Sequence, residues 1–161
     1  MHLSHAQRGG VCRDTRGPLF DEEVKNMNEI RNAIKEGFRL MKTAKVAHFI
    51  TIGADGIQVR PMGAVFPGKA DDEVVIITYR DSRKVAQVKA DSRATLYFHL
   101  GPEYVVLRGV ATVGDDAEIR HKLWRNSFLR YFPGGADDPN YVYIILKVDV
   151  GIHKKLVQPG S

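Results

Sequence analysis

Apolar segments joined by short polar turns are the feature of this sequence that most restricts its fold. The segments are rich in β-branched and aromatic residues and are predicted as strands. They cover residues 46–52, 57–66, 73–78, 93–100, 103–113 and 141–150. Asp55-Gly56 and Gly101-Pro102 indicate turns between antiparallel strands, and Gly109 predicts a bulge or a close backbone approach. The series favours an antiparallel sheet closed or partly closed into a barrel.

Three further stretches are predicted as helices that flank this sheet. Residues 22–42 repeat apolar side chains at the spacing of an amphipathic helix, namely Ile30, Ile34, Phe38 and Met41. A short helix is expected over 82–89, and a longer one from Asp115 or Asp116, as N-cap, to about residue 131. Strand and helix do not alternate regularly, and no Gly-x-Gly-x-x-Gly or Walker-type loop follows a strand, which disfavours a doubly wound parallel sheet. The predicted fold class is mainly β with flanking helices.

Length and composition favour one globular domain. The chain has 161 residues, of which 43% are hydrophobic, enough to bury one core. Residues 1–20 are polar and rich in Gly and Arg, so we expect a flexible leader followed by a single domain over 21–161. No run approaches the roughly 18 to 20 apolar residues of a membrane span, and the first residues lack the apolar segment of a secretory signal. We therefore expect a cytoplasmic protein.

The positive charge of the chain gathers in two clusters. The formal net charge is +5. One cluster lies within residues 80–93 and the other within 120–130. Solvated surface charges account for most of these residues, but the first cluster suffices to neutralise one phosphomonoester. Sequence-independent nucleic-acid binding usually needs a longer basic stripe or tail, so a small-molecule phosphate is favoured over nucleic acid.

The polar turn after the predicted strand 73–78 is the strongest candidate for that phosphate site. Ser82 stands where a helix begins, and the unpaired N–H groups of a helix start attract anions. Arg83 and Lys84 in the first helical turn are unfavourable by about 0.3 to 1 kcal/mol unless an anion is present. Charge-assisted hydrogen bonds of about 1.5 to 3 kcal/mol each more than offset this cost. The alternative is a solvated turn in which Ser82 is an ordinary helix cap.

A second candidate lies in the preceding strand, at Arg60, Pro61 and Met62. Proline cannot donate to a sheet ladder, so Pro61 implies an edge strand, a bulge, or a strand that faces something other than another strand. The pattern alone slightly favours a simple edge. Arg60, in an otherwise apolar strand, indicates a ligand site instead.

Other chemistries find little support in the sequence. The histidines share no metal-ligand spacing, so no metal is predicted. A nucleophile elbow for Ser/His/Asp catalysis is also missing from the sequence. No catalytic residue is identified.

Five motifs in order along the chain resemble a known family. They are Arg60-Pro61-Met62, Thr78-x-x-x-Ser82-x-Lys84, Tyr104-Val105-Val106-Leu107-Arg108-Gly109-Val110-Ala111, Leu123-Trp124 and Tyr131-Phe132-Pro133-Gly134-Gly135-x-Asp137-Asp138-Pro139. Together they resemble the pyridoxamine 5'-phosphate oxidase-like FMN-binding split barrels, most closely the general stress protein subgroup. The similarity extends from about Ile30 to Val150.

The resemblance implies a six-stranded antiparallel split β-barrel that forms a homodimer, with FMN at the subunit interface. Ser82, Arg83 and Lys84 would hold the FMN phosphate, joined by Arg60 from the neighbouring strand. These assignments agree with the reading of the turn as a phosphate site.

The same resemblance places further residues around the flavin. Thr78 and Tyr79 would lie beside the ribityl chain or the ring, and the backbone of Pro61 and Met62 would meet the ring edge. Tyr104, and less surely Trp124, would come from the partner subunit. Trp124 is equally well explained as an ordinary core or interface aromatic.

The chain also departs from the family. The Arg-x-His signature that binds the substrate phosphate in the true oxidases is missing near its C-terminus, so pyridoxamine phosphate oxidation is not expected. The resemblance implies a flavin-dependent oxidoreductase that takes hydride from a reduced nicotinamide, NADH or NADPH, and acts on an unknown small substrate. The alternative is a non-catalytic FMN-binding stress protein that stores or senses flavin. Heme or a deazaflavin in the same fold is a third, weaker possibility.

Overall fold

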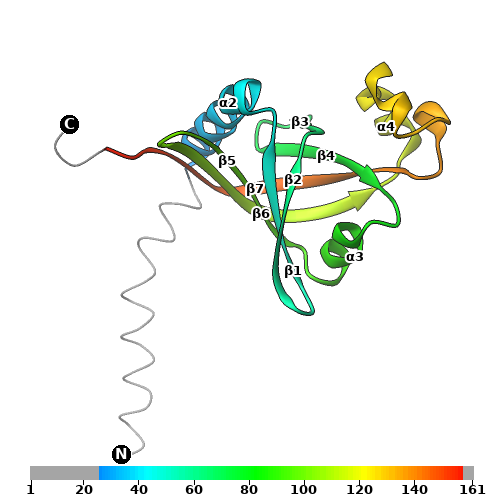
Figure 1. The fold of residues 1–161 in the computed structure, drawn as a ribbon, viewed down its shortest axis with the longest axis horizontal. Helices are drawn as coiled ribbons and strands as arrows, with labels where there is room; N and C mark the ends of the chain where they lie inside the picture. Colours follow the sequence, from blue (N-terminus) through cyan, green and yellow to red (C-terminus); the bar gives the residue numbers. More distant parts are fainter. Residues whose placement is uncertain (1–25, 158–161) are drawn as a thin grey trace, which may run out of the picture.

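One antiparallel sheet, curled into a half-barrel, organises the molecule (Figure 1). The computed structural model describes residues 26–157. The strands are β1 (Ala47–Gly53), β2 (Gly56–Met62), β3 (Val65–Pro67), β4 (Glu73–Tyr79), β5 (Arg93–Leu100), β6 (Glu103–Gly114) and β7 (Tyr141–Lys155). The helices are α2 (Met27–Ala44), α3 (Arg83–Ala90) and α4 (Ala117–Leu123), with the 3₁₀ helices η1 (Asn126–Arg130) and η2 (Gly135–Asp137). The strand order is β2-β1-β5-β6-β7-β4-β3.

The sheet has seven strands, so the expectation of six was wrong. The predicted strand 57–66 is two strands, because the chain leaves β1 after Met62 and Val65 begins to pair with β4. At Ala64, between them, the carbonyl oxygen accepts a hydrogen bond from the backbone N–H of Ile77 (3.0 Å). β2 and β3 are the two edges of the sheet, yet three residue steps, at most about 11 Å, join them. This short crossover forces the sheet to curl until its edges approach.

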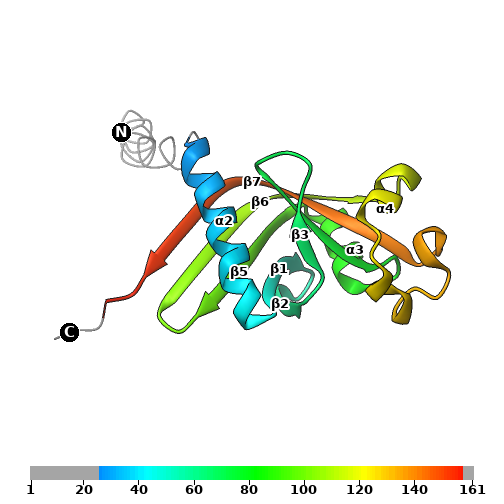
Figure 2. The same ribbon diagram turned by 90° about the horizontal axis from the view of Figure 1, so that it is seen from above.

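Helix α2 closes one face of the half-barrel and crosses the strands β5, β6 and β7 (Figure 2). It buries an apolar stripe of Ile30, Ala33, Ile34 and Leu40. The predicted start near residue 22 lies outside the described residues, as does the expected leader over 1–20. The helix ends at Ala44, two residues later than predicted. Its C-cap is Lys45, whose φ of 64° is left-handed and whose N–H donates to the carbonyl of Met41 (2.8 Å). None of the described helices is long and apolar enough to cross a membrane.

A second apolar cluster lies against β4 and β7, away from the main core, and is formed by Val75, Ile77, Phe128, Phe132, Tyr141 and Tyr143. The helix predicted to reach residue 131 ends at Leu123 instead, so its predicted length was wrong. Its N-cap is Asp116, as expected, because the Asp116 carboxylate accepts from the backbone N–H of Ile119 (3.1 Å). The chain bends at Trp124, whose ring packs edge-on against Phe128. Packing in this cluster therefore overrides local helix propensity.

The bulge expected at Gly109 is confirmed. The pairing of β6 with β7 shifts register between Arg108 and Gly109, and a Cβ at residue 109 would lie only 1.8 Å from the carbonyl oxygen of Lys147. β7 continues beyond the predicted end at residue 150 and pairs there with the first half of β6. The two longest strands, β6 and β7, therefore pair with each other and connect both ends of the sheet.

Candidate functional site

A cavity of about 520 Å³ lies where the crossover between β2 and β3 meets the end of β4 and the η1 segment. Five of the ten predicted site residues line it: Pro61, Met62, Thr78, Tyr79 and Lys84. The remaining lining residues are Lys45, Gly63, Ala64, Phe66, Ile77, Arg125, Ser127, Phe128, Arg130, Tyr131 and Phe132. The structure therefore brings both sequence candidates, the Pro61 strand and the Lys84 turn, to one place.

The turn between β4 and α3 is organised by hydrogen bonds among the predicted phosphate residues. Thr78 is buried, with 4% of its surface exposed, and its Oγ1 accepts a hydrogen bond from Nζ of Lys84 (2.9 Å). Oγ of Ser82 lies 3.4 Å from the same Oγ1. Ser82 is the N-cap of α3, but its side chain caps no backbone N–H among the described residues. Its hydroxyl therefore does not serve as the ordinary cap considered above.

Arg60 is held beside this turn by a separate network. Its Nη1 donates to Oγ1 of Thr51 (2.7 Å) and its Nη2 donates to Oε1 of Gln87 (2.6 Å). Thr51, itself only 1% exposed, donates to the same Gln87 oxygen (2.6 Å). β2 is an edge strand, as the proline suggested, and the network fixes the Arg60 guanidinium against α3.

Like charges crowd this side of the site. Burial lowers the pKa of Lys84, and the positive charge of Arg60 lowers it further. Burial likewise lowers the pKa of Arg60, with a further decrease caused by Arg83. Within residues 26–157, none of these three cations forms a salt bridge with a carboxylate. A bound dianion would relieve this repulsion, so the cluster suits a phosphate.

The other walls of the cavity are aromatic. Tyr79 packs against Phe132 with their ring centroids 5.0 Å apart, and Phe66 lies 5.7 Å from Phe128. Ile77 adds an aliphatic surface. A cavity with such walls and a few polar groups suits a planar organic ligand. The donor set and the walls together fit a ring that carries a phosphate chain.

Sequence reasoning missed the contribution of η1 to the cavity. Arg125, Ser127, Phe128 and Arg130 line it, together with Lys45 at the end of α2. The basic cluster within residues 120–130 is visible in the sequence, but the sequence predicts it on a continuous helix. The break after α4 is what brings these side chains to the cavity.

Trp124 lies within its own chain's aromatic cluster. Its ring is 5.7 Å from that of Phe128, at 85°, and 5.6 Å from that of Tyr141. This packing fits the interpretation of Trp124 as an ordinary aromatic. A contact with flavin across a subunit interface stays a prediction.

Tyr104 does not line the cavity. Its ring belongs to a group with His48, Tyr97 and His99. This group adjoins the β2 side of the cavity, because His48 pairs with Tyr97 on one side and with Pro61 of the cavity wall on the other. A contact between Tyr104 and flavin across a subunit interface stays a prediction.

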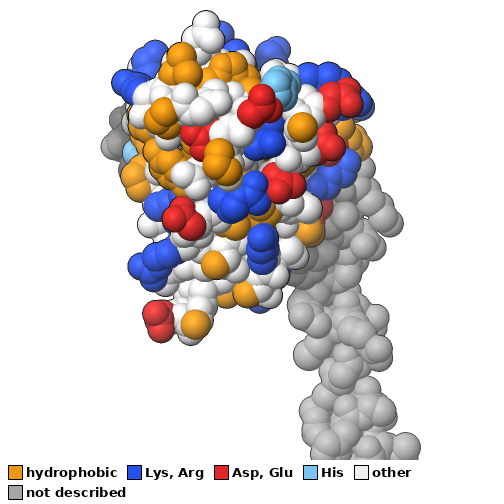
Figure 3. Space-filling model, turned by 90° about the vertical axis from the view of Figure 1, so that its right-hand side faces the viewer, with side chains coloured by type: hydrophobic (Ala, Val, Ile, Leu, Met, Phe, Trp, Pro, Cys, Tyr) orange, Lys and Arg blue, Asp and Glu red, His pale blue; other side chains and the backbone are white. Residues whose placement is uncertain are grey.

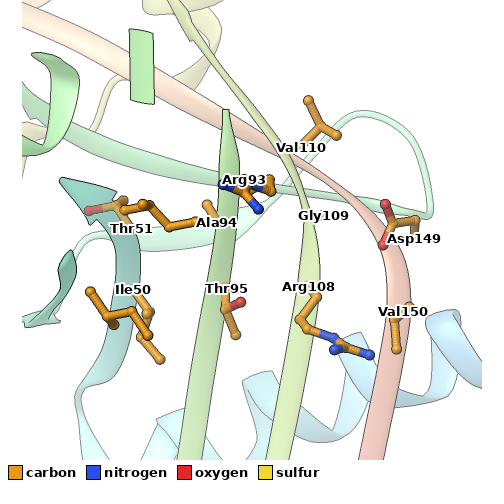
Figure 4. A pocket seen from close by; sticks show the side chains of 12 residues that line it. Ile50, Thr51, Arg93, Ala94, Thr95, Arg108, Gly109, Val110, Asp149 and Val150 are labelled. Carbon is orange, nitrogen blue, oxygen red and sulfur yellow. The ribbon is translucent and has the colours of Figure 1, made fainter. Parts of the chain in front are cut away.

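A second hollow, of about 420 Å³, lies across β1, β5, β6 and β7 (Figure 4). The side chains around it include Arg93, Arg108 and Asp149. Ile57 also lines it and is 72% exposed. None of the ten predicted site residues lines this hollow. It is an exposed surface distinct from the cavity of the predicted site.

The end of the molecule that carries α4 mixes charges of both signs (Figure 3). Hydrophobic side chains gather toward the upper left of this view, among lysine and arginine side chains. Several acidic side chains lie beside basic ones, such as Asp115 with Arg80 (3.0 Å) and Asp137 with His121 (2.7 Å). This end of the molecule is therefore not a uniformly basic surface, as binding to a nucleic-acid backbone would require.

One group of potential metal ligands lies away from the cavity. Glu36, Glu103 and His153 bring ligand atoms within 4.8 Å of one another. Arg39 donates hydrogen bonds to both carboxylates, and His153 lies 2.7 Å from Glu103. The hydrogen bond from His153 and the charge of Arg39 lower the pKa of Glu103. The cluster therefore has a structural explanation, the attachment of the last part of β7 to α2.

Comparison with known proteins identifies relatives of the chain. Residues 32–152 match the family described as "Pyridoxamine 5'-phosphate oxidase like". No curated protein sequence matches. Among solved structures, a Clostridium acetobutylicum protein related to general stress protein 26 is 20% identical, with a TM-score of 0.66 over 80% of this chain and 92% of that one.

Two further structures show the same fold. General stress protein 26 of Bacillus anthracis is 20% identical, with a TM-score of 0.62 over 76% of this chain and 97% of that chain. A Xanthomonas citri protein described as a general stress FMN/FAD-binding protein is 19% identical, with a TM-score of 0.60 over 76% and 89%. These likenesses confirm the predicted antiparallel split-barrel fold, apart from the number of strands.

Proposed function

The chain belongs to the pyridoxamine 5'-phosphate oxidase-like family, and from this premise we propose that it binds FMN in the cavity beside Lys84. The observation that carries the proposal is the cation cluster at the start of α3. Lys84 is half-buried, has no carboxylate partner within residues 26–157, and donates to the buried Oγ1 of Thr78. A cation held in this way needs an anion, and the terminal phosphate of FMN is a dianion at neutral pH.

The residues would divide the flavin between two parts of the cavity. Ser82, Arg83 and Lys84, with Arg60, would hold the phosphate, and Thr78 and Tyr79 would lie along the ribityl chain or the ring. The backbone of Pro61 and Met62 lies at the cavity wall and would meet the ring edge. The Xanthomonas citri neighbour is described as binding FMN or FAD, which supports a flavin. The three crowded cations favour the phosphomonoester of FMN over the diester of FAD.

We further propose that the protein is a homodimer with FMN at the subunit interface. Tyr104 does not line the cavity of its own chain, and in the dimer it would meet the flavin of the partner subunit. The edge strand β2 exposes Ile57 (72%) and Val59 (59%), two apolar residues that a second subunit would cover. Trp124 is equally well assigned to its own chain's cluster.

The proposed activity is that of a flavin-dependent oxidoreductase in the cytoplasm. Bound FMN supplies two-electron transfer, from NADH or NADPH to a small acceptor. The chain's own part is to orient the ring against Phe66 and Phe128 and to keep water from it. Rapid oxidation of NADH or NADPH by the FMN-loaded protein, with a quinone or nitroaromatic acceptor, would support this activity. Absence of turnover with either donor would refute it.

A non-catalytic flavin-binding role is the second candidate. The observation that favours it is that no Asp, Glu or His lines the described part of the cavity, so the site lacks the carboxylate and imidazole groups that most often serve as general acid or base. In that case FMN would stay bound, and no acceptor added to the photoreduced protein would reoxidise the flavin rapidly. Fast reoxidation of the photoreduced protein by one acceptor would exclude storage as its only role.

The cofactor itself can be identified directly. We expect the purified protein to be yellow and to release FMN on heat denaturation. Chromatography and absorbance spectra of the released cofactor distinguish FMN from FAD, deazaflavin and heme. A protein that is colourless and does not bind added FMN would overturn the proposal.

A further inference from the structure

We propose that the cavity has a second anion site, formed by Lys45, Arg125 and Arg130, that binds the carboxylate of an aromatic organic acid. This inference rests on the proposed function only in assigning the Lys84 side of the cavity to FMN. The aromatic acid would be the molecule that meets the flavin. The site deepens the proposed function because it names a substrate class.

The charge of the cavity wall is the first argument. Of its sixteen lining residues, four are Lys or Arg, and none of the described ones is Asp, Glu or His. Lys45, Arg125 and Arg130 form no salt bridge within the part of the chain that the structure describes. Other exposed cations do find carboxylates, for example Lys122 with Glu118 (3.1 Å). The lining of the cavity therefore carries four positive charges and, among the described residues, no negative one.

The position of the two arginines is the second argument. The guanidinium of Arg125 lies over the ring of Phe66, 4.5 Å from its centroid, and that of Arg130 lies 4.9 Å from the centroid of the Tyr131 ring. Stacking on a ring orients the plane of a guanidinium and leaves its N–H groups free at the edge. Two oriented guanidinium groups suit a planar carboxylate, which accepts paired hydrogen bonds.

Lys45 contributes the third cation at an unusual backbone conformation. It ends α2 with a φ of 64°, at a helix terminus where glycine or asparagine is usual. A lysine in this conformation is strained, and such residues cluster at ligand sites. Its carbonyl oxygen lies near Gly63, in the crossover that also lines the cavity. Lys45 therefore places a positive charge at a position where the usual glycine or asparagine would place none.

These cations are separate from the proposed phosphate site. Arg125 is the N-cap of η1 and Arg130 its last residue, after α4, whereas Ser82 and Lys84 lie at the start of α3. In Figure 1, α3 lies below the end of β4 and α4 lies above it. One phosphate is satisfied by the α3 side, so the η1 side remains for another anion. The rings of Phe66, Phe128 and Tyr131 provide the apolar surface for the body of an aromatic acid.

A matched pair of probes tests the inference: 2-naphthoate and its uncharged amide, 2-naphthamide. Binding of each is measured by calorimetry to the full chain, with and without bound FMN. We expect naphthoate to bind about tenfold or more tightly than the amide. In the double variant Arg125→Gln/Arg130→Gln this preference should fall to about threefold or less, with FMN affinity unchanged. Lys122→Gln, on α4 outside the cavity, is the control and should keep the full preference.

Each other outcome is decisive. Equal binding of the two probes, or a preference that survives the double substitution, would overturn the second anion site. Loss of FMN affinity with unchanged naphthoate preference would assign the arginines to the flavin and would also overturn it. If FMN does not bind but the arginine-dependent preference for naphthoate remains, the second site stands and the proposed function fails.

Discussion

Two groups of cations line one cavity, but the protein supports them in different ways. Lys84 follows the buried strand β4, is half-buried, and hydrogen-bonds to buried Thr78. Arg125 and Arg130 are the N-cap and the last residue of a short 3₁₀ helix, are exposed, and rest on aromatic rings. The first group is preorganised for a ligand that stays, and the second suits a ligand that exchanges. The difference follows from the elements that carry them, since a buried strand is more rigid than an exposed single-turn segment.

The largest expected effect is on the free energy of unfolding, when a buried residue of the η1 wall of the cavity is replaced. Phe128 is 6% exposed and packs against Phe66 and Trp124. Replacing Phe128 by alanine leaves a cavity and should cost about 3 kcal/mol of the free energy of unfolding, measured by urea denaturation. Leu129→Ala is the matched control, because Leu129 is 48% exposed and should change stability by no more than about 0.5 kcal/mol. Equal effects of the two substitutions would show that η1 does not order this wall.

The next largest effect is on FMN affinity, when the cation at the start of α3 is replaced. Lys84→Met should weaken FMN binding by about 1.5 to 3 kcal/mol, tenfold or more, because a charge-assisted hydrogen bond is lost. Stability should not fall, because a half-buried cation without a carboxylate partner among the described residues is removed. Lys89→Met, exposed on the same helix, should leave FMN affinity unchanged. Affinities are measured by quenching of flavin fluorescence.

A smaller effect shows whether the Ser82 hydroxyl contacts the ligand or caps helix α3. Ser82→Ala should weaken FMN binding by about 1 kcal/mol, the contribution of one hydrogen bond. Because the Ser82 side chain caps no described N–H group of α3, the free energy of unfolding should stay the same. A loss of about 1 kcal/mol in stability with unchanged affinity would assign the residue to capping after all.

The smallest effect is a dependence on pH. Burial and Arg60 lower the pKa of Lys84 in the free protein from its usual 10.5, whereas a bound phosphate dianion would raise it. Binding therefore takes up a proton between the two pKa values, and FMN affinity should fall as the pH rises through the lowered pKa of Lys84. Lys84→Arg keeps its charge at these pH values and should flatten the profile. An identical slope in both proteins would show that Lys84 does not contact the phosphate.

Local signals in the sequence predicted most of the sheet. Asp55-Gly56 marks the first hairpin, Gly109 the bulge and Asp116 the start of α4, because each depends on backbone geometry within a few residues. The same holds for the turn from Thr78 to Lys84, where strand, helix start and cations are contiguous.

The features that depend on distant contacts could not be predicted in this way. The strand over 57–66 divides because Val65 pairs with Ile76 of β4, and α4 ends early because Trp124 packs against Tyr141. The η1 wall of the cavity was missed for the same reason. Arg125 reaches the cavity only once the helix has broken.

The most direct test of the central claim is the difference in affinity between FMN and riboflavin, which share the ring and differ by the phosphate. If the turn from Thr78 to Lys84 holds that phosphate, the wild-type protein binds FMN about tenfold or more tightly than riboflavin. The Lys84→Met variant should lose most of this preference. Equal affinity of the wild-type protein for the two flavins would contradict the account.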